Sequence, residues 1–410
     1  MAKITWANIF HIYQPPDWNK AVVLKVVRES YQPFFQKLIK HPNVKITLNI
    51  CGSLTEQLYI LSCGPVLENI RLLAERGQIE FTASMKYHAL LPFIPESEIK
   101  RQVQLNYDIN RKLIGATYKP KGFFLPEMCY SRQSADVIAR LGHPWIILDE
   151  ISYNGKVGEV SFDEGYSLDS SSLKIIFRNR DVSDMFFMDI LKSTSAFHEK
   201  IEQDNRSNKN LITSCDGENL GHHNPALLKV WFDLVSSPKF TTVTISEVLS
   251  SYTKFVSVKP VPSSWASRES ELKNKEPYYL WESRHNLIQT NQWKLTKLVL
   301  QQIKHTGTDN INYQRARNLL DKALASDQYW WASASPWWNV EIISVSSAKL
   351  IRVLHLLGVN KTVLSKANKY YDNIIKISHQ WQSSGKAEQS KKNYLASEDF
   401  TRYFGGEKVN

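Results

Sequence analysis

Seven short apolar runs, rich in β-branched and aromatic residues, recur through the first half of the chain. They lie at 4–13, 44–51, 78–83, 122–126, 145–149, 173–179 and 211–215. Runs that are apolar along most of their length favour strands covered on both faces. Stretches with helical spacing separate them, and the clearest lie at 21–39, 65–76, 96–113 and 131–141. Alternating strands and helices predict a parallel sheet, and seven repeats favour a closed barrel.

The pattern changes twice along the chain. Residues 152–172 are rich in Gly, Ser and Asp and predict a long loop over one rim of the barrel. After a Pro- and Ser-rich stretch at 258–264, helical spacing dominates, with long candidates at 285–303, 313–325, 342–357 and 362–382. We therefore predict an α/β chain with an irregular (β/α)7 barrel at 1–260, a helical bundle at 261–383 that completes the cleft, and a polar, flexible tail at 384–410.

Two of the apolar runs end in a carboxylate where the chain turns. Glu127 follows the run at 122–126, and Asp216 follows the run at 211–215. Functional groups of parallel barrels lie at the carboxyl ends of strands, so His11, Glu127, Asp216 and Glu218 should share one mouth. A pair of carboxylates suits acid/base and nucleophilic chemistry on a glycosidic bond. Taken singly, Glu127 could equally cap a helix and Asp216 could be an ordinary loop residue.

Composition narrows the class of protein. The chain has 410 residues, a formal charge of +11, and four cysteines without Cys-x-x-Cys spacing. The lysines are scattered and no nucleic-acid module is recognisable, so we expect a solvated cationic surface and no nucleic-acid partner. The N-terminus lacks the pattern of a signal peptide, and no apolar run reaches the roughly 18 residues of a membrane span. We expect a cytoplasmic protein that does not bind membranes.

Aromatic residues point to a sugar ligand. The chain has 12 tryptophans, several of them crowded at 330–331 and 337–338. Sugar rings present apolar C–H faces that pack on flat indole rings, while their hydroxyl groups need polar partners. Trp265 and Trp330 are the candidates for stacking on an oligo- or polysaccharide, although most tryptophans in a protein of this size pack in the core.

Five short motifs, in this order, resemble those of glycoside hydrolase family 57. They are Phe-His-Ile-Tyr-Gln-Pro at 10–15, Gly-Gln-Ile-Glu at 77–80 with Tyr-His-Ala-Leu-Leu-Pro at 87–92, Gly-Phe-Phe-Leu-Pro-Glu-Met-Cys-Tyr at 122–130, Asp-Gly-Glu with Gly-His at 216–222, and Ala-Ser-Asp-Gln-Tyr-Trp at 325–330. The resemblance spans residues 6 to about 338 and implies an enzyme acting on α-glucans, of the α-amylase or 4-α-glucanotransferase kind, with a seven-stranded barrel and a helical C-terminal region.

The resemblance also implies roles for individual residues. Glu127 takes the position of the nucleophile and Asp216 that of the acid/base, in a retaining mechanism that needs the two carboxyl groups about 5–5.5 Å apart. Asp327 takes the position of an aspartate that the helical region contributes to the site. No metal or cofactor is implied. The residues expected to contact substrate are His11, Tyr13, Glu80, Glu218, His222, Trp265, Asp327 and Trp330.

Two departures and two alternatives accompany this interpretation. Tyr13 stands where most members have a second histidine, and Phe123 or Phe124 stands near a usual tryptophan, so we expect altered sugar positioning. A metal-dependent polysaccharide deacetylase, which would use Asp and His, is one alternative; adjacent residues such as His222 and His223 seldom ligate one ion. A catalytically silent glucan-binding protein is the other. Hydrolysis and transfer both remain open, as does the oligomeric state.

Overall fold

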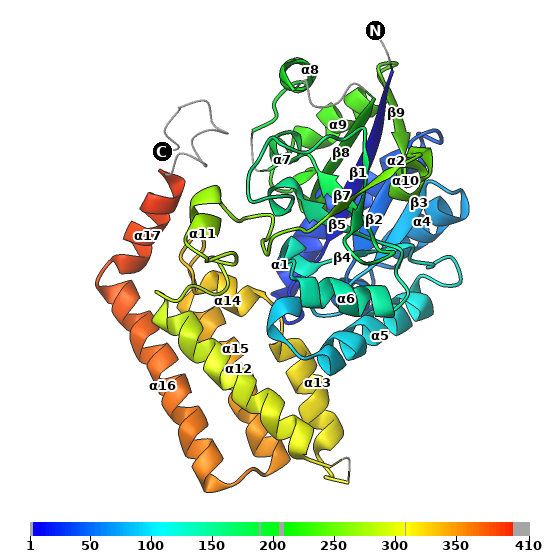
Figure 1. Ribbon diagram of the computed structural model, residues 1–410. Helices are drawn as coiled ribbons and strands as arrows, with labels where there is room; N and C mark the ends of the chain where they lie inside the picture. Colours follow the sequence, from blue (N-terminus) through cyan, green and yellow to red (C-terminus); the bar gives the residue numbers. More distant parts are fainter. Residues whose placement is uncertain (1–2, 188–189, 205–208, 308, 397–410) are drawn as a thin grey trace. The chain divides into compact units, whose positions relative to one another are not determined.

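The computed structural model describes residues 3–187, 190–204, 209–307 and 309–396, which belong to two compact units. The first unit, Met1–Trp265, carries the sheet, and the second, Ala266–Asn410, is helical (Figure 1). The division falls after Trp265 rather than at 260 because the intervening segment is bonded to the first unit. Val261 N–H donates to the Ser152 carbonyl at 2.8 Å, and Tyr130 N–H donates to the Ser263 carbonyl at 2.8 Å.

All seven predicted runs form strands, and these strands are parallel neighbours in a curled sheet. In the order β7-β5-β4-β3-β2-β1-β8 they are β7 (Lys174–Arg178), β5 (Trp145–Asp149), β4 (Gly122–Phe124), β3 (Ile79–Ala83), β2 (Ile46–Ile50), β1 (Ile4–Ile12) and β8 (Asn210–Asp216). The two ends of this row meet where Asn179 N–H donates to the Ile212 carbonyl at 2.8 Å. The expected seven-stranded parallel barrel followed by a helical region is confirmed.

Among the described residues, three further strands were not predicted. They are β6 (Gly165–Leu168), β9 (Phe240–Val243) and β10 (Phe255–Val258). Strand β6 pairs antiparallel with β7 and parallel with β10, while β9 pairs with the first residues of β1. The expectation of an irregular loop at 152–172 is therefore wrong in part, since β6 lies inside it. This strand is only four residues long, and Gly165 is there because a Cβ would meet the Phe255 ring at 2.7 Å.

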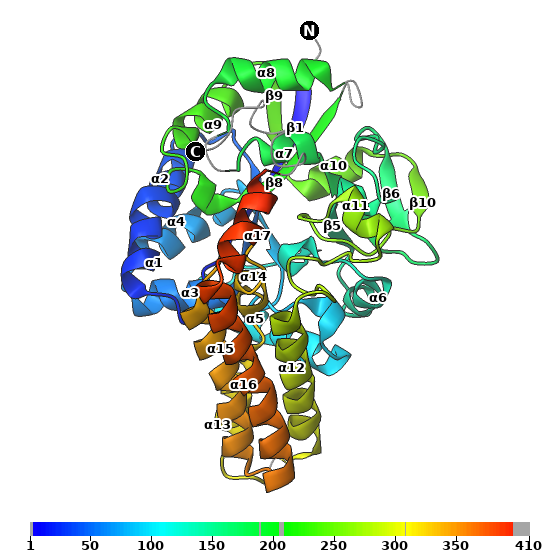
Figure 2. The ribbon, with the colours of Figure 1, turned by 90° about the vertical axis from the view of Figure 1, so that its left-hand side faces the viewer.

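Helices lie around the sheet in both ribbon views (Figures 1 and 2). The predicted segments correspond to α1 (Lys20–Val26), a π-helical turn (Val27–Tyr31), α2 (Gln32–Ile39), α4 (Gly64–Glu75), α5 (Glu96–Leu113) and α6 (Arg132–Arg140). In the described part of the first unit, five other helices were not predicted: α3 (Gly52–Ile60), α7 (Arg180–Asp184), α8 (Thr194–Gln203), α9 (Leu227–Val235) and α10 (Ile245–Ser251). Most of these are a few turns at most, too short to show a clear helical period.

The core between sheet and helices accounts for two of the tryptophans. Trp6 and Trp231 are fully buried, and Phe10 lies against Trp231 with ring centroids 5.3 Å apart. The two indole N–H groups find acceptors, Thr213 Oγ1 at 2.9 Å for Trp6 and Asn8 Oδ1 at 3.0 Å for Trp231. Both indoles are therefore core residues with satisfied polar edges rather than sugar platforms.

The second unit contains the four predicted long helices, which run side by side in both ribbon views: α12 (Leu287–His305), α13 (Tyr313–Ala323), α15 (Val340–Leu357) and α16 (Lys361–Ser383). Shorter helices are α11 (Glu269–Lys273), α14 (Asp327–Trp331) and α17 (Lys386–Leu395). Helix α17 lies within the segment expected to be a flexible tail, of which 397–410 lies outside the described residues. In the part of the chain that the structure describes, no helix is both long and apolar enough to cross a membrane.

Candidate active site

Three chain turns at the carboxyl edge of the barrel strands each carry an acidic residue. A single 3-10 turn follows β4, β5 and β8, and these turns contain Glu127, Glu150 and Glu218 respectively. Asp216 ends β8 immediately before its turn. Since the strands are parallel, all three turns leave the sheet at the same edge, as the strand order predicted.

Glu127 occupies a strained backbone conformation. Its φ is 57° and its ψ is 16°, and the next residue, Met128, has a φ of 46°. A left-handed conformation costs a non-glycine residue on the order of 1–3 kcal/mol and persists where the surroundings hold it. Trp265 N–H donates to the Glu127 carbonyl at 3.2 Å and supplies part of that restraint. Glycine would adopt this sharp turn without strain, but here the turn carries the carboxylate of Glu127.

The Glu127 carboxylate is held from two sides. Trp265 Nε1–H donates to Oε2 at 2.9 Å, and His88 Nδ1 lies 3.6 Å from Oε1. The side chain is 14% exposed, so a ligand can still reach it. Burial keeps the pKa of His88 well below its usual value, so we treat the histidine contact as one with a neutral ring rather than as an ion pair. The charge-assisted bond from the indole is the stronger restraint.

A stack of flat rings lies beside Glu127. The His11 ring stacks on Phe124 with centroids 4.6 Å apart and on His88 at 4.9 Å, and Tyr13 stacks on His88 at 4.2 Å. His11 Nδ1 lies 2.6 Å from Asn49 Oδ1, an acceptor, so this nitrogen carries the proton of the neutral ring. Burial lowers the pKa of His11 to about 4. Tyr13, in the place of a second histidine, contributes a flat face to the same stack.

Asp216 lies next to His11 across the sheet, because the two residues pair in the β1–β8 register. Burial raises the pKa of Asp216 to about 7, and the positive charge of Arg178 opposes that rise. Glu218 accepts hydrogen bonds from Tyr31 Oη at 3.2 Å and Gln14 Nε2 at 3.3 Å. Burial and the charge of Asp216 raise the pKa of Glu218 to about 8. This end of the barrel therefore retains protons at neutral pH.

The π-helical turn anchors the loop that carries Asp216 and Glu218. Ser30 Oγ donates to the Gly217 carbonyl at 2.9 Å, and His222 Nδ1 lies 2.7 Å from Glu29 Oε2. Gly221 has a φ of 110°, and a Cβ there would meet the Glu29 carbonyl oxygen at 2.2 Å. Single π-helical turns such as Val27–Tyr31 are frequent at functional sites. His222 thus binds Glu29, and its contact with substrate stays a prediction.

One predicted substrate residue does not join this cluster. Glu80 lies near the amino end of β3, two residues before Thr82, whose Oγ1 accepts from Asn49 at the level of His11. At about 3.3 Å per strand residue, Glu80 is about 7 Å further down the barrel. Its carboxylate accepts from Ser246 N–H at 3.2 Å and caps the first turn of α10. The expected contact of Glu80 with sugar stays a prediction.

Two other predicted residues belong to the second unit. Asp327 begins α14, and Trp330 lies in the same helix. The Trp330 ring is 6.3 Å from that of Trp331 and 6.5 Å from that of Trp337. The participation of Asp327 and Trp330 in the sugar site stays a prediction.

Sequence reasoning gave no role to four residues that contact the candidate site residues. Gln14 and His88 lie within two of the motifs, Tyr31 lies in a helical segment, and Arg178 ends β7. The strand-end rule that found Glu127 and Asp216 also points to Arg178, because it is the last residue of its strand. Nothing in the pattern of the chain signals that Tyr31 reaches Glu218.

Two of the stacked rings belong to a cluster of possible metal ligands. Ligand atoms of His11, Cys51 and His88 all lie within 4.8 Å of one another. However, the two imidazole rings are only 23° from parallel, so their in-plane lone pairs run side by side rather than converging on one point. This arrangement fits a metal ion poorly, and the expectations of no metal and no cofactor stay predictions.

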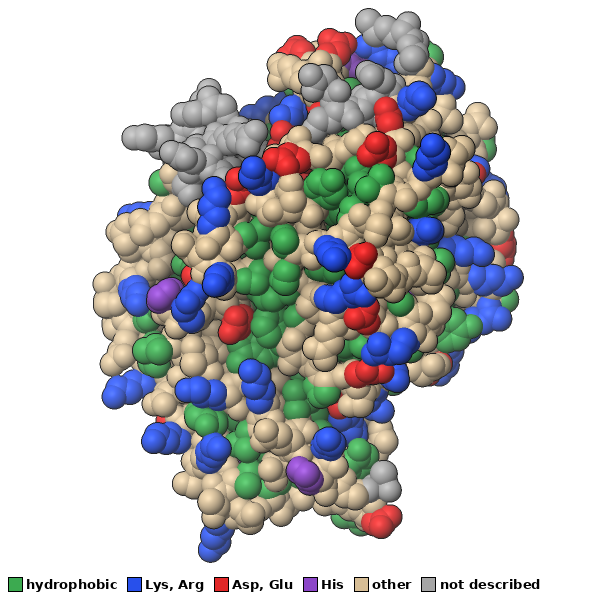
Figure 3. All heavy atoms as spheres, in the orientation of Figure 1, with side chains coloured by type: hydrophobic (Ala, Val, Ile, Leu, Met, Phe, Trp, Pro, Cys, Tyr) green, Lys and Arg blue, Asp and Glu red, His purple; other side chains and the backbone are tan. Residues whose placement is uncertain are grey.

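The charged side chains of the surface do not form one patch in the view of Figure 3. On that face, Lys and Arg side chains are spread among acidic and uncharged ones. The distribution agrees with the expected solvated cationic surface, and the absence of a nucleic-acid partner stays a prediction.

Comparison with known proteins gives a consistent set of matches. The family model of Glycosyl hydrolase family 57 matches residues 5–261. An α-amylase of Pyrococcus horikoshii is 23% identical over 305 residues, covering 71% of this chain and 47% of the relative. A 4-α-glucanotransferase of Thermococcus litoralis is 25% identical over 290 residues, covering 67% and 43%. The crystal structure of 4-α-glucanotransferase from Thermococcus litoralis superposes with a TM-score of 0.67 at 20% identity, covering 86% of this chain and 60% of that one. The chain spans less than half the length of these two curated relatives.

Proposed function

The chain belongs to glycosyl hydrolase family 57, and we propose that it is a retaining glycosidase or transglycosylase acting on α-glucans. Glu127 is the nucleophile and Asp216 is the general acid/base. The observation that carries this proposal is the difference between the two carboxyl groups. The Trp265 indole donates to Glu127 and favours its anion, whereas burial raises the pKa of Asp216 to about 7 and favours its acid form.

In the first step, Glu127 attacks the anomeric carbon while Asp216 gives its proton to the leaving glycosidic oxygen. The bond from the anomeric carbon to that oxygen breaks as the bond to the Glu127 carboxylate forms. The product is a covalent glycosyl ester of Glu127 and a free sugar hydroxyl on the departing chain.

In the second step, the anion of Asp216 takes a proton from water or from a sugar hydroxyl that attacks the ester. Glu127 leaves as a carboxylate and Asp216 recovers its proton. Water as the acceptor gives hydrolysis, and a sugar hydroxyl gives transfer, so both outcomes use the same two groups.

The stack of flat rings supports recognition of a sugar. The stacked rings of His11, Tyr13 and His88 end in polar atoms, and Trp265 adds an indole whose N–H already binds Glu127. Such a surface combines the apolar faces and polar edges that a pyranose ring requires. The match to the family model does not favour the deacetylase or the silent binding protein.

The test is a product profile on maltooligosaccharides and polymeric α-glucans, with the anomeric signals followed by NMR. We expect an initial product with the α configuration, and products longer than the substrate if transfer competes with hydrolysis. An initial product of inverted configuration would exclude the covalent intermediate. Activity that a chelator abolishes would favour the deacetylase, and binding without any turnover would favour the silent binder.

A further inference from the structure

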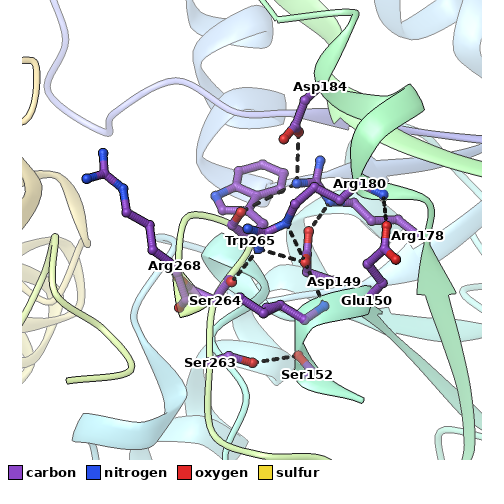
Figure 4. Close-up of polar contacts among 12 residues, drawn as sticks. Asp149, Glu150, Ser152, Arg178, Arg180, Asp184, Ser263, Ser264, Trp265 and Arg268 are labelled. Carbon is purple, nitrogen blue, oxygen red and sulfur yellow. Dashed lines mark hydrogen bonds and ion pairs between the residues drawn. The ribbon is translucent and has the colours of Figure 1, made fainter. Parts of the chain in front are cut away.

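Arg178, the last residue of β7, lies in a buried network of charged groups at the mouth of the barrel (Figure 4). Its side chain is 5% exposed. Its Nε–H donates to Asp149 Oδ2 at 2.6 Å, and its Nη2 lies 3.0 Å from Asp184 Oδ1. Asp149 in turn accepts from Arg180. Two carboxylates therefore fix the direction of the Arg178 guanidinium group.

The rest of the guanidinium group reaches both sides of the proposed active site. Nη1–H donates at 3.1 Å to the carbonyl of Ser214, two residues before Asp216. Nη2–H donates at 3.4 Å to the carbonyl of Trp265, and the guanidinium carbon lies 5.6 Å from the centroid of that indole ring. The same indole donates to Glu127. One side chain thus touches the backbone before the acid/base and the residue that holds the nucleophile.

We infer that Arg178 is a positioning residue that fixes Trp265 against Glu127 and supplies the positive charge facing Asp216. This inference rests on the proposed function. Arginine suits the task because its planar fork can satisfy several acceptors at fixed angles while remaining charged. A lysine would provide the charge at a single point without the fork.

The groups around Asp216 decide how its charge responds to Arg178. They are the Glu218 carboxyl in the following turn, the Tyr31 hydroxyl in the π-helical turn, the Cys215 thiol, the neutral His11 ring on β1, and Arg178 on β7. Of these groups, Arg178 carries the positive charge. Removing it should raise the pKa of Asp216, so that the acid form survives to higher pH.

Arg180 offers a matched control in the same network. It is also buried and donates to Asp149, at 2.8 Å, but its second acceptor is the Ser264 carbonyl at 3.5 Å. A change at Arg180 disturbs the ion pair with Asp149, which the two arginines share, but Arg178 can still donate to the carbonyls of Ser214 and Trp265. If only a general loosening of the network mattered, substitutions of Arg178 and of Arg180 should lower the activity equally.

The experiment compares Arg178→Lys, Arg178→Gln and Arg180→Lys on two substrates. α-Maltosyl fluoride needs no acid to expel fluoride, so its burst rate reports on Glu127, whereas maltooligosaccharides also need Asp216. We expect Arg178→Lys to lower the fluoride burst rate about tenfold with little shift of the pH profile. Arg178→Gln should also move the alkaline limb of kcat/KM for maltooligosaccharides upward by at least about half a pH unit. For Arg180→Lys, the burst rate per folded molecule and the alkaline limb of kcat/KM should match those of the wild type.

A double variant with Trp265→Phe tests the route through the indole even if Arg178→Gln does not fold. If Arg178 acts through Trp265, the burst rate of Arg178→Lys with Trp265→Phe should lie within about twofold of the slower single variant. The inference would be overturned if the fold-losses in burst rate of the two single variants multiplied in the double variant. It would also be overturned if Arg178→Lys and Arg180→Lys lowered the burst rate equally, and Arg178 would then be a structural residue.

A measurement without turnover separates this inference from the proposed function. Carboxyl ¹³C NMR of Asp-labelled protein, with Asp216→Asn to assign the signal, gives the pKa of Asp216 directly. A wild-type enzyme inactive on every α-glucan would end the proposed function, while a pKa that rises in Arg178→Gln would still support the charge role. An unchanged pKa in a folded variant would remove that role whatever the activity.

Discussion

The ends of β4 and β8 both deliver a carboxylate to the mouth of the barrel, but they do so in opposite ways. At the β4 end, Glu127 sits in a left-handed turn and receives a hydrogen bond from the Trp265 indole. At the β8 end, Asp216 continues a regular strand, with Glu218 close behind it on a loop fastened to the π-helical turn. Glu127 therefore lies in a strained turn and receives a hydrogen bond, whereas Asp216 is buried in a regular strand close to a second carboxyl group.

Under the proposed function, this contrast explains how two carboxyl groups can perform different chemistry. A nucleophile must remain an anion, and a donor aimed at its oxygen favours the anion. A general acid must keep its proton near neutral pH, and burial with an adjacent carboxyl group favours the neutral form. The environment at each strand end, rather than the choice between Glu and Asp, assigns the role.

Replacing Glu127 by Gln tests the β4 side and should have the largest effect. The amide keeps the shape but cannot form the glycosyl ester, so kcat should fall about a thousandfold or more. Steady-state rates on maltotetraose measure the loss, and circular dichroism with a binding isotherm shows that fold and affinity survive. A variant that retained turnover would remove Glu127 from the mechanism.

Replacing Asp216 by Asn tests the β8 side. We expect kcat/KM on maltooligosaccharides to fall by about 10²–10⁴, and the alkaline limb near pH 7 to disappear with the carboxyl group that titrates there. The fluoride burst from α-maltosyl fluoride should remain, since fluoride leaves without a proton. Azide, which attacks the ester without a base, should restore turnover. Loss of the burst as well would contradict the division of roles.

Trp265→Phe sharpens the comparison by removing a single donor. The ring remains, but the bond from Nε1 to Glu127 Oε2 is lost. Without this donor the Glu127 carboxylate is no longer held in one orientation, so we expect the burst rate to fall by about 10- to 100-fold. The alkaline limb assigned to Asp216 should stay in place. A shifted limb with an unchanged burst would place the indole on the acid/base side instead.

Glu218→Gln should have the smallest effect, seen in stability against pH. The pKa of Glu218 in the folded protein, about 8, lies above the ordinary value of 4.5, so folding takes up a proton between these pH values. The stability linked to that proton is complete below about pH 4.5 and is lost as the pH rises through 8. Glutamine does not titrate, so the variant should melt a few degrees above wild type at pH 9 and show little or no gain near pH 4.

Differential scanning calorimetry across this pH range measures the difference between the two proteins. Equal melting temperatures at pH 9 would mean that Glu218 titrates normally in the folded state. The β8 end would then lack the second retained proton that distinguishes it from the β4 end.

The sequence predicted most of the scaffold because its signals are local. Seven apolar runs became the seven barrel strands, and four long amphipathic stretches became α12, α13, α15 and α16. Strand β6 was missed because four residues give no period to read. The strand-end rule assigned His11, Glu127 and Asp216 to the same edge, since parallel strands share one carboxyl edge. The same rule did not exclude Glu80, whose level in the barrel depends on the register of β3.

What the amino-acid sequence determined by itself was therefore the order of strands and helices and the presence of two carboxylates at strand ends. Periodicity records which neighbouring side chains are buried together, and turns follow from local chemistry. Only the tertiary structure decided that Trp265 reaches Glu127, that Tyr31 and Gln14 bind Glu218, and that Arg178 touches both sides. These contacts join residues 87 to 204 positions apart, with the exception of the short link from Arg178 to Ser214 at 36. The charge state of each carboxyl group depends on its burial and on such distant partners, and no local pattern encodes them.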